Sequence, residues 1–584
     1  MSSSRKWVVL AGIGLAAAGC FRSGPQQQQE PAAVRGPAFT DVTAAAGLGD
    51  FRHERGAFGR MWMPETFGAG GGFVDYDGDG WADVLLVGGG VWPGHGTPVP
   101  ALELYRNDRD GTFTRVTEET GLAGVRAHGF GFAAADYDND GDQDIYLTTV
   151  FENLLFRNDA GPGGGRVFTE VGRAAGVAGE PTWSTAALFF DADRDGHVDL
   201  YVGNYVPWTP ETDRFCTSDG QTKDYCTPHQ YEGVPNRFFH NNGDGTFTDW
   251  TGRVDVGRGA GKTLGVAEMD FDNDGWPDVV VANDTQRNLV YHNDGDGTFT
   301  EIGVASGVAF DPNGRARAGM GVDAGVVDET GETSIFVGNF SDEMVGVWRH
   351  AGGRLFADRS AASGIGMSTL RVLTFGVLLV DVDLDGDLDF LAANGHIIEH
   401  VDRMEAGISY RQPAQLFLND GRGGFTPATN VAGGVFDKPL VARALAAADI
   451  DHDGDLDLLL TENGGPAHLW RNDLDPQARD GLHFLRVRLE GRQSNRDALG
   501  SRVVVVAGGR RQERRVRTGS SYLAQSETTV SFGLGASAVV DTLRVEWPGG
   551  HVDVFTGVAA DRELHLVEGQ PAPGLTAAAA SPAP

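Results

Sequence analysis

Short apolar segments separated by polar turns recur along most of the chain, and three signals accompany them in a fixed order. The first is Phe-Thr at the start of a strand. The second is an aspartate-rich loop between two apolar strands, and the third is a short strand that ends in Arg-Asn or a similar pair. The third signal is joined to the Phe-Thr signal that follows it by turns such as Asn293-Asp294-Gly295-Asp296-Gly297. Turns of this composition are typical of β-hairpins. Each unit therefore predicts four strands.

Seven such units lie between residues 39 and 473, and four-stranded sheets repeated radially form a β-propeller. A solenoid is the alternative, but the ends of the repeat favour a closed ring. The first Phe-Thr strand, at 39–43, has no partner before it, and the last strand, Leu469-Trp470-Arg471-Asn472, has no Phe-Thr strand after it. If these two strands pair, no sheet edge stays free. We therefore predict an all-β fold with a seven-bladed propeller over residues 39–473.

The stretch from Asp136 to Asp144 has the residue order of a calcium loop. Carboxylates at positions 1, 3, 5 and 9 can converge on one ion, glycine at position 6 allows the sharp turn, and position 7 offers its backbone carbonyl. Hard oxygen ligands in that number suit calcium better than zinc or copper. An EF-hand is excluded because strands flank the loop and no glutamate stands at position 12. The predicted calcium ligands of six such loops are Asp75, Asp77, Asp79, Trp81 and Asp83; Asp136, Asp138, Asp140, Asp142 and Asp144; Asp191, Asp193, Asp195, His197 and Asp199; Asp270, Asp272, Asp274, Trp276 and Asp278; Asp381, Asp383, Asp385, Asp387 and Asp389; and Asp449, Asp451, Asp453, Asp455 and Asp457.

A further loop, in the fifth unit, is degenerate. Val326, Asp328, Thr330 and Ser334 occupy its four carboxylate positions, so three ligands are lost. We expect this blade to form without an ion and the other six loops to hold six structural calcium ions. Turn-forming aspartates without an ion are the alternative, but turns alone would not require four carboxylates in each of six loops. Folding should then depend on calcium.

The acidic residues fall in these spaced clusters, although the formal net charge is −34. Nucleic acid is therefore excluded as a partner, because phosphate binding needs a basic surface. The N-terminus reads as an export signal: Arg5 and Lys6 precede an apolar run, Trp7 to Ala18, that is too short to span a bilayer. Ala17-Ala18-Gly19-Cys20 resembles a bacterial lipobox, which predicts a lipoprotein-type signal peptide over residues 1–20 and lipidation of Cys20. A plain cleaved signal is the alternative.

The predicted lipid anchor would hold the exported protein on a bacterial membrane, with the outer membrane expected, on the periplasmic or cell-surface side. Residues 21–38 have the composition of a flexible tether. The two other cysteines, Cys216 and Cys226, are predicted to form a disulfide, as expected for an even pair in an exported protein. They lie in an insertion at about 205–235. This insertion is either a binding surface or a cap over neighbouring blades.

The segment 482–570 reads as short alternating strands and predicts a small β-rich C-terminal domain. It carries a basic cluster formed by Arg510, Arg511, Arg514, Arg515 and Arg517. At strand spacing such a cluster is expected to be a solvated face, with an anion site as the alternative. The tail at 571–584, rich in Ala and Pro, is expected to be disordered.

These residues carry a family resemblance. The Asp-x-Asp-x-Asp-Gly units resemble the FG-GAP/VCBS repeats of integrin-α-type propellers. The stretches Ser494 to Val503, Gly519 to Ser526, Phe532-Gly533-Leu534-Gly535 and Val545 to Gly550 look like an ASPIC/UnbV domain. Together the chain resembles bacterial relatives of cartilage acidic protein. That resemblance implies an exported calcium-binding protein whose molecular activity is poorly defined.

Two function classes stay open. The first is an exported binding or adhesion module for an extracellular protein or glycan. Asn204, Asn283, Asn339, Asn394 and Asn463 recur at strand ends and could line its face, or else satisfy loop backbone groups. The second is a carbohydrate-active lyase or hydrolase with a site near the propeller channel. The sequence contains no nucleophile elbow, zinc motif or phosphate loop, and His396 is the most suggestive candidate base. We therefore predict no catalytic residue and favour the binding class.

Overall fold

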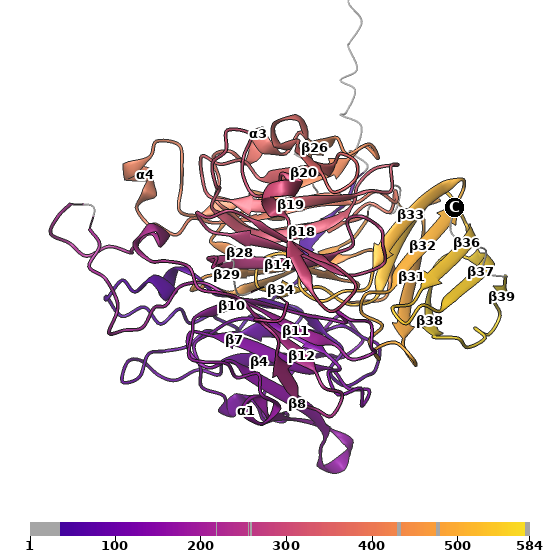
Figure 1. The fold of residues 1–584 in the computed structure, drawn as a ribbon, viewed down its shortest axis with the longest axis horizontal. Coiled ribbons are helices and arrows are strands. Elements are labelled where there is room, and N and C mark those ends of the chain that lie inside the picture. The colour runs from indigo at the N-terminus through magenta and orange to yellow at the C-terminus, as the bar shows by residue number, and fades with distance from the viewer. Residues whose placement is uncertain are drawn as a thin grey trace, which may run out of the picture. The chain divides into compact units, whose positions relative to one another are not determined.

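The computed structural model describes residues 36–578 apart from residues 218, 255, 257–259, 429–433, 475–478 and 480. The signal peptide, Cys20 and residues 21–35 of the expected tether lie outside the described residues. From residue 36 onward the chain forms one compact unit. It contains the repeat region and the strands that follow it (Figure 1).

In the part of the chain that the structure describes, the repeat region contributes four antiparallel strands to each of seven sheets. This confirms the all-β class and the seven blades. The blades, in chain order, are β2 (Gly71–Val74), β3 (Asp83–Val87), β4 (Leu102–Asn107) and β5 (Phe113–Arg115); β6 (Gly129–Ala135), β7 (Asp144–Thr149), β8 (Leu154–Ala160) and β9 (Arg166–Glu170); β10 (Ser184–Phe190), β11 (Asp199–Asn204), β12 (Arg237–Asn241) and β13 (Phe247–Asp249); β14 (Thr263–Met269), β15 (Asp278–Asn283), β16 (Leu289–Asn293) and β17 (Phe299–Glu301); β18 (Gly319–Val326), β19 (Thr333–Asn339), β20 (Gly346–His350) and β21 (Phe356–Asp358); β22 (Thr374–Val380), β23 (Asp389–Asn394), β25 (Gln415–Asn419) and β26 (Phe425–Pro427); and β28 (Ala442–Ala448), β29 (Asp457–Glu462), β30 (Ala467–Asn472) and β1 (Phe39–Asp41).

The ring closes as the repeat pattern predicts. β1 pairs antiparallel with β30, with Phe39 opposite Asn472 and Asp41 opposite Trp470. The first strand of the repeat therefore completes the last blade, and this contact joins the two ends of the propeller without a free edge.

The blade strands are apolar on both faces because each sheet packs between two others. In β3, Val84 and Leu86 contact the seventh blade in a cluster with Leu459, whereas Leu85 and Val87 contact the second blade in a cluster with Leu147. Alternate residues of a strand point to opposite faces, so one uninterrupted apolar run supplies both interfaces. The fifth blade follows the same rule and forms a complete four-stranded sheet.

The C-terminal segment forms two further sheets beside the blades (yellow in Figure 1). Their strands are β31 (His483–Glu490), β35 (Val530–Gly535) and β38 (Arg562–Val567), and then β32 (Arg502–Ala507), β33 (Arg510–Arg515), β36 (Val539–Glu546), β37 (Val552–Ala559) and β39 (Thr576–Ala577). The expected disorder from residue 571 is wrong for the described part of the tail. β39 pairs with β37 there, with Ala577 opposite Phe555. Short α-helices among the described residues are α1 (Gly172–Ala175), α2 (Gly303–Ser306), α3 (Gly366–Thr369) and α4 (Val401–Met404).

One segment of the C-terminal domain enters the propeller. β34 (Ala524–Gln525) pairs in parallel with β2, where Gly72 lies opposite Gln525. A Cβ on Gly72 would lie 2.1 Å from the Gln525 carbonyl oxygen, so only glycine allows this approach. Tyr522 is fully buried with its ring 4.8 Å from Phe375 of β22. The first strands of adjacent blades contact one another around the ring. Residues 519–527 therefore occupy its centre, a role that the sequence did not reveal.

Candidate metal centres and the two faces of the propeller

The six aspartate-rich loops connect the first two strands of six blades, and each curls around its first aspartate. In the second blade, Asp136 Oδ1 accepts the N–H of Asp140 at 3.0 Å, and Oδ2 accepts the N–H of Gly141 at 2.7 Å. Gly141 has φ of +105°, which side chains rarely allow. The carboxylate of position 1 thus fixes the turn that gathers the other ligands.

The carboxylate of position 9 joins the loop to the third strand of its blade. Asp144 Oδ1 accepts the N–H of Asn158 at 2.7 Å, and Asn158 Nδ2 donates to the carbonyl of Tyr76, in the loop of the first blade, at 2.7 Å. The asparagine of the Arg-Asn signal is therefore a clamp between neighbouring blades. The sequence pattern alone predicts only that this signal ends a strand. The residues that make this bond are Asn107, Asn158, Asn241, Asn293, Asn419 and Asn472.

Four of the six third-position aspartates carry an oxygen that no protein group satisfies. Asp77, Asp138, Asp193 and Asp272 each bury their Oδ1 without a hydrogen-bond partner. In the first and second blades, oxygens from positions 1, 3 and 9 lie within 4.8 Å of one another. A buried carboxylate oxygen without a donor is costly. These oxygen-only clusters therefore fit a hard divalent cation such as calcium.

Without a bound cation, burial disfavours the charged form of these carboxylates. It raises the pKa of Asp136 to about 8, with added repulsion from Asp497, Asp140 and Asp138. The same cause raises the pKa of Asp83 to about 9. A bound divalent ion would favour the charged form of each group.

In the first and third blades the position-7 side chain contacts the neighbouring loop, so position 7 offers only its backbone carbonyl as a ligand there. Trp81 stacks on His452 of the seventh-blade loop with ring centroids 3.8 Å apart, and His197 Nδ1 lies 3.0 Å from Asn139 Nδ2. Adjacent loops thus touch through their position-7 side chains.

In the fifth blade a guanidinium pairs with the carboxylate that the degenerate loop retains at position 3. Arg349 of β20 pairs with Asp328 Oδ2, and the Asp328 side chain is only 6% exposed. Arg349 lies opposite Ser334, which is position 9 of the degenerate loop. The one remaining carboxylate is therefore neutralised by the chain itself.

The basic cluster of the C-terminal domain contacts the loops, so its expected role as a solvated face is wrong. Arg515 donates to Asp270 Oδ2 at 2.6 Å, Arg510 pairs with Asp387, and Arg517 pairs with the fully buried Asp323. Arg511 is the exposed member of the cluster. The anions that these arginines bind belong to the propeller, and strand spacing alone could not show that.

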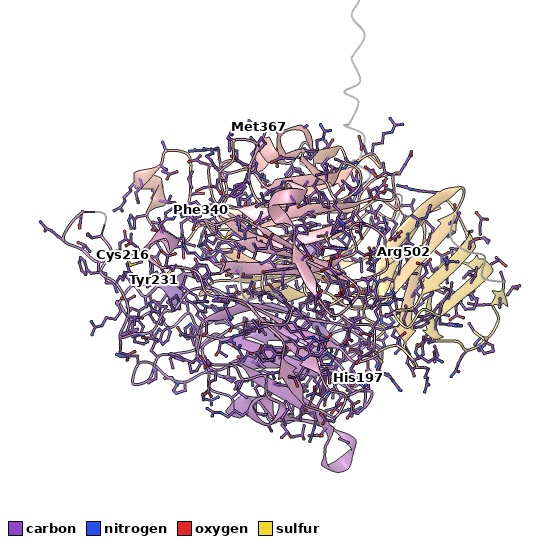
Figure 2. All side chains as sticks on the ribbon, viewed as in Figure 1. His197, Cys216, Tyr231, Phe340, Met367 and Arg502 are labelled. Carbon is purple, nitrogen blue, oxygen red and sulfur yellow. A yellow bond between two sulfur atoms is a disulfide. The ribbon has the colours of Figure 1, made fainter. Side chains whose placement is uncertain are left out.

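The opposite face carries the insertion at 205–235. Cys216 and Cys226 form a disulfide, and Figure 2 shows Cys216 and Tyr231 on the side of the molecule away from Arg502. Trp208 is buried against Trp62 and Trp92, with ring centroids 5.5 and 5.4 Å apart. The insertion thus covers loops of the first blade.

A cavity of about 310 Å³ lies beside this aromatic cluster. Its lining includes Trp92, His95, Arg126, His128 and Phe151. Phe151 is 39% exposed, and Phe215 of the insertion is 64% exposed. This face therefore offers ring surfaces to solvent.

The strand-end asparagines satisfy backbone groups, which is the second of their two expected roles. Their Nδ2 groups donate to loop carbonyls, namely those of Pro235, Arg287, Met344, Pro413 and Glu65 for Asn204, Asn283, Asn339, Asn394 and Asn463.

His396 is buried at 1% exposure, and its Nδ1 accepts the N–H of Ile398 at 3.0 Å. Burial lowers the pKa of His396 to about 4. In this position it does not face solvent as a catalytic base would.

The fold defines a seven-bladed propeller joined to a β-rich C-terminal domain that enters its centre. Family models agree with both parts: an FG-GAP-like repeat matches residues 75–147, 212–280, 270–337 and 401–460, and ASPIC and UnbV matches residues 491–573. The chain contains FG-GAP-like repeats followed by an ASPIC/UnbV domain and is homologous to cartilage acidic protein 1. It is 23% identical to that protein of Homo sapiens over 567 residues (91% of this chain, 75% of the relative) and 23% identical to that of Xenopus tropicalis over 540 residues (86% and 73%).

Solved structures that match part of the chain include an Agrocybe aegerita lectin described as recognising non-reducing terminal N-acetylglucosamine, at 17% identity and a TM-score of 0.37, covering 64% of this chain and 84% of that chain. Another is BBS1N in complex with ARL6DN, at 11% identity and a TM-score of 0.36, covering 70% and 93%. No helix among the described residues is long and apolar enough to cross a membrane. The disulfide and the homology to cartilage acidic protein 1 indicate an exported protein with an extracellular β-propeller-type module.

Proposed function

We propose that this protein is an exported, calcium-stabilised β-propeller that acts as a binding or adhesion module for an extracellular protein or glycan. The observation that carries the calcium part is the set of buried, unpartnered oxygens on Asp77, Asp138, Asp193 and Asp272. The same position recurs in loop after loop. About six calcium ions would each bind between positions 1, 3, 5 and 9 and the carbonyl of position 7. Their role is structural, because the loops connect strands and lie against the C-terminal domain.

The ligand-binding face is the one that carries the insertion. The C-terminal domain occupies the loop face through contacts such as Arg515 with Asp270. The other face presents the aromatic cavity, exposed Phe151 and exposed Phe215. Exposed aromatic side chains beside a cavity are typical of binding surfaces.

Binding to glycan and extracellular-protein arrays tests this assignment with calcium-loaded full-length protein. Phe151→Ser should abolish a signal that the wild-type protein gives. Phe310→Ser, at a residue that is 37% exposed and belongs to another loop, is the matched control and should keep it. A signal that survives Phe151→Ser and Phe215→Ser together would place the ligand elsewhere.

A lipid anchor at Cys20 completes the proposal and would hold the module at a bacterial membrane. Its support is the lipobox-like sequence alone. Mass spectrometry of the mature N-terminal peptide tests it, since a diacylglyceryl mass on Cys20 is expected. An unmodified N-terminus beyond residue 20 would contradict it.

A further inference from the structure

The C-terminal domain contacts the position-1 aspartates of different loops through side chains of different charge. Arg515 donates to Asp270 Oδ2 at 2.6 Å, and Arg486 Nε lies 3.3 Å from Asp449 Oδ2. Asp270 is 3% exposed and Asp449 is fully buried. A guanidinium therefore already holds one oxygen of each of these two predicted ligands.

The position-1 aspartates of two other loops meet a neutral and an acidic residue of the C-terminal domain. Asn495 Nδ2 lies 3.4 Å from Asp191 Oδ2, and Asp497 Oδ2 accepts the N–H of Asp136 at 2.7 Å. Asp497 thus adds a carboxylate at the entrance to the second-blade loop. Loops of the same pattern therefore differ within one ring: a guanidinium of the C-terminal domain contacts the first aspartate in two blades, and no cation is bonded to the first aspartate in two others.

A cation beside a ligand oxygen opposes the arrival of a second cation, and water is largely excluded from these contacts, so screening is weak. We infer that the C-terminal domain sets the order of calcium affinities around the ring. The loops at Asp270 and Asp449 bind the ion more weakly than the loops at Asp136 and Asp191. This order rests on the proposed calcium function of the loops. By linkage, calcium at the two weaker loops loosens the contacts of Arg515 and Arg486 by the same factor.

Calcium titration calorimetry of full-length Arg515→Met tests the order. The substitution removes the guanidinium and keeps an apolar stem, so one site should bind calcium about tenfold more tightly while the number of sites stays the same. Arg515→Lys keeps the positive charge and should behave as the wild-type protein does. Arg502→Met is the matched control, because Arg502 pairs with Glu513 and Glu546 inside the C-terminal domain. Arg502 itself is labelled on that domain in Figure 2.

Asp497→Asn is the converse test and should weaken one of the tighter sites several-fold. Unchanged affinities in Arg515→Met, or a weaker site, would overturn the inferred order while leaving the proposed calcium sites intact. A wild-type protein that binds no calcium would overturn the proposed function and this order with it.

Hydrogen–deuterium exchange of the wild-type protein at stepwise calcium concentrations gives the order without any variant. Residues 136–144 and 191–199 should become protected at lower calcium than residues 270–278 and 449–457. Simultaneous protection of all four loops, or the reverse order, would contradict the inference.

Discussion

Two loops of the same ring, Asp136–Asp144 in the second blade and Val326–Ser334 in the fifth, connect equivalent strands of equivalent sheets. The first gathers carboxylates and leaves Asp138 Oδ1 buried without a partner. The second retains Asp328 alone among the four ligand positions, and Arg349 pairs with it. Both blades contain four complete strands.

This difference shows that forming a blade and neutralising the carboxylates of its loop are separate requirements. A blade forms as long as its apolar strands fill both interfaces. An external cation is needed only where several buried carboxylates meet, because one carboxylate can be balanced by one guanidinium. The fifth loop is also held by Asn419, which donates to the carbonyl of Val327 as its counterparts do in other blades.

Calcium removal should produce the largest effect and should separate the two kinds of loop. At a free concentration a thousand times its Kd, each bound ion adds about 4 kcal/mol to the free energy of unfolding. We expect EGTA to lower the Tm in differential scanning calorimetry by at least about 10 °C. In hydrogen exchange the six loops should lose protection while residues 327–332 do not. An unchanged Tm would contradict calcium binding by the six loops.

The calcium-induced rise in Tm should be larger at pH 8 than at pH 5.5. Burial raises the pKa of Asp136 and Asp191 to about 8 in the folded chain without an ion, above the value near 3.9 for unfolded aspartate. The ion-free folded state then binds protons that the unfolded state releases, so its stability falls as pH rises through 8. Calcium competes with those protons and restores the lost stability. Equal shifts in Tm at the two pH values, measured at matched ionic strength, would refute this competition.

The repeat fold could be predicted from sequence because its determinants are local. Phe-Thr, the aspartate loop and Arg-Asn each mark a position within one blade, and ring closure followed from the unpaired strand at Phe39 and its counterpart at Asn472. The six ligand sets were likewise contained in nine-residue stretches. Whether an ion occupies them is still a prediction.

The contacts between distant segments could not be predicted in this way. Gln525 pairs with Gly72 across more than four hundred residues, and Arg515 reaches Asp270 from another domain. Neither pairing leaves a periodic signal, because each joins two segments that lie far apart in the chain. The role of Arg349 could not be predicted either, although Arg349 and Asp328 belong to the same blade, because an arginine at this strand position does not have a fixed partner. Its position on the third strand matches that of Arg106, which turns instead to Asp108 at 2.8 Å.

Restoring the fifth loop should create a seventh calcium site. The variant combines Val326→Asp, Thr330→Asp and Ser334→Asp with Arg349→Leu, since the sixth blade carries Leu418 at the equivalent position beside an intact loop. Gly331 already has the positive φ, +75°, that position 6 requires. Calorimetric titration should show one more calcium ion per chain than the wild-type protein binds, and saturating calcium should add up to about 4 kcal/mol. The same three aspartates with Arg349 retained are the control and should bind the extra ion more weakly.

Arg349→Met should have the smallest effect of these changes and test the guanidinium directly. It leaves Asp328 at 6% exposure without its partner, which costs about 3 kcal/mol when an ion pair is this well buried. Calcium should not restore the loss, because three of the four ligand positions lack carboxylates. Removing both charges, in Asp328→Leu with Arg349→Met, should recover most of the stability, and denaturant unfolding of the four proteins in this cycle measures the coupling.

Arg106→Met is the matched control on the first blade. Its pair with Asp108 is 41% and 24% exposed, so a loss below about 1 kcal/mol is expected. Equal losses of unfolding free energy in Arg349→Met and Arg106→Met would contradict the proposal that Arg349 takes the place of a bound ion.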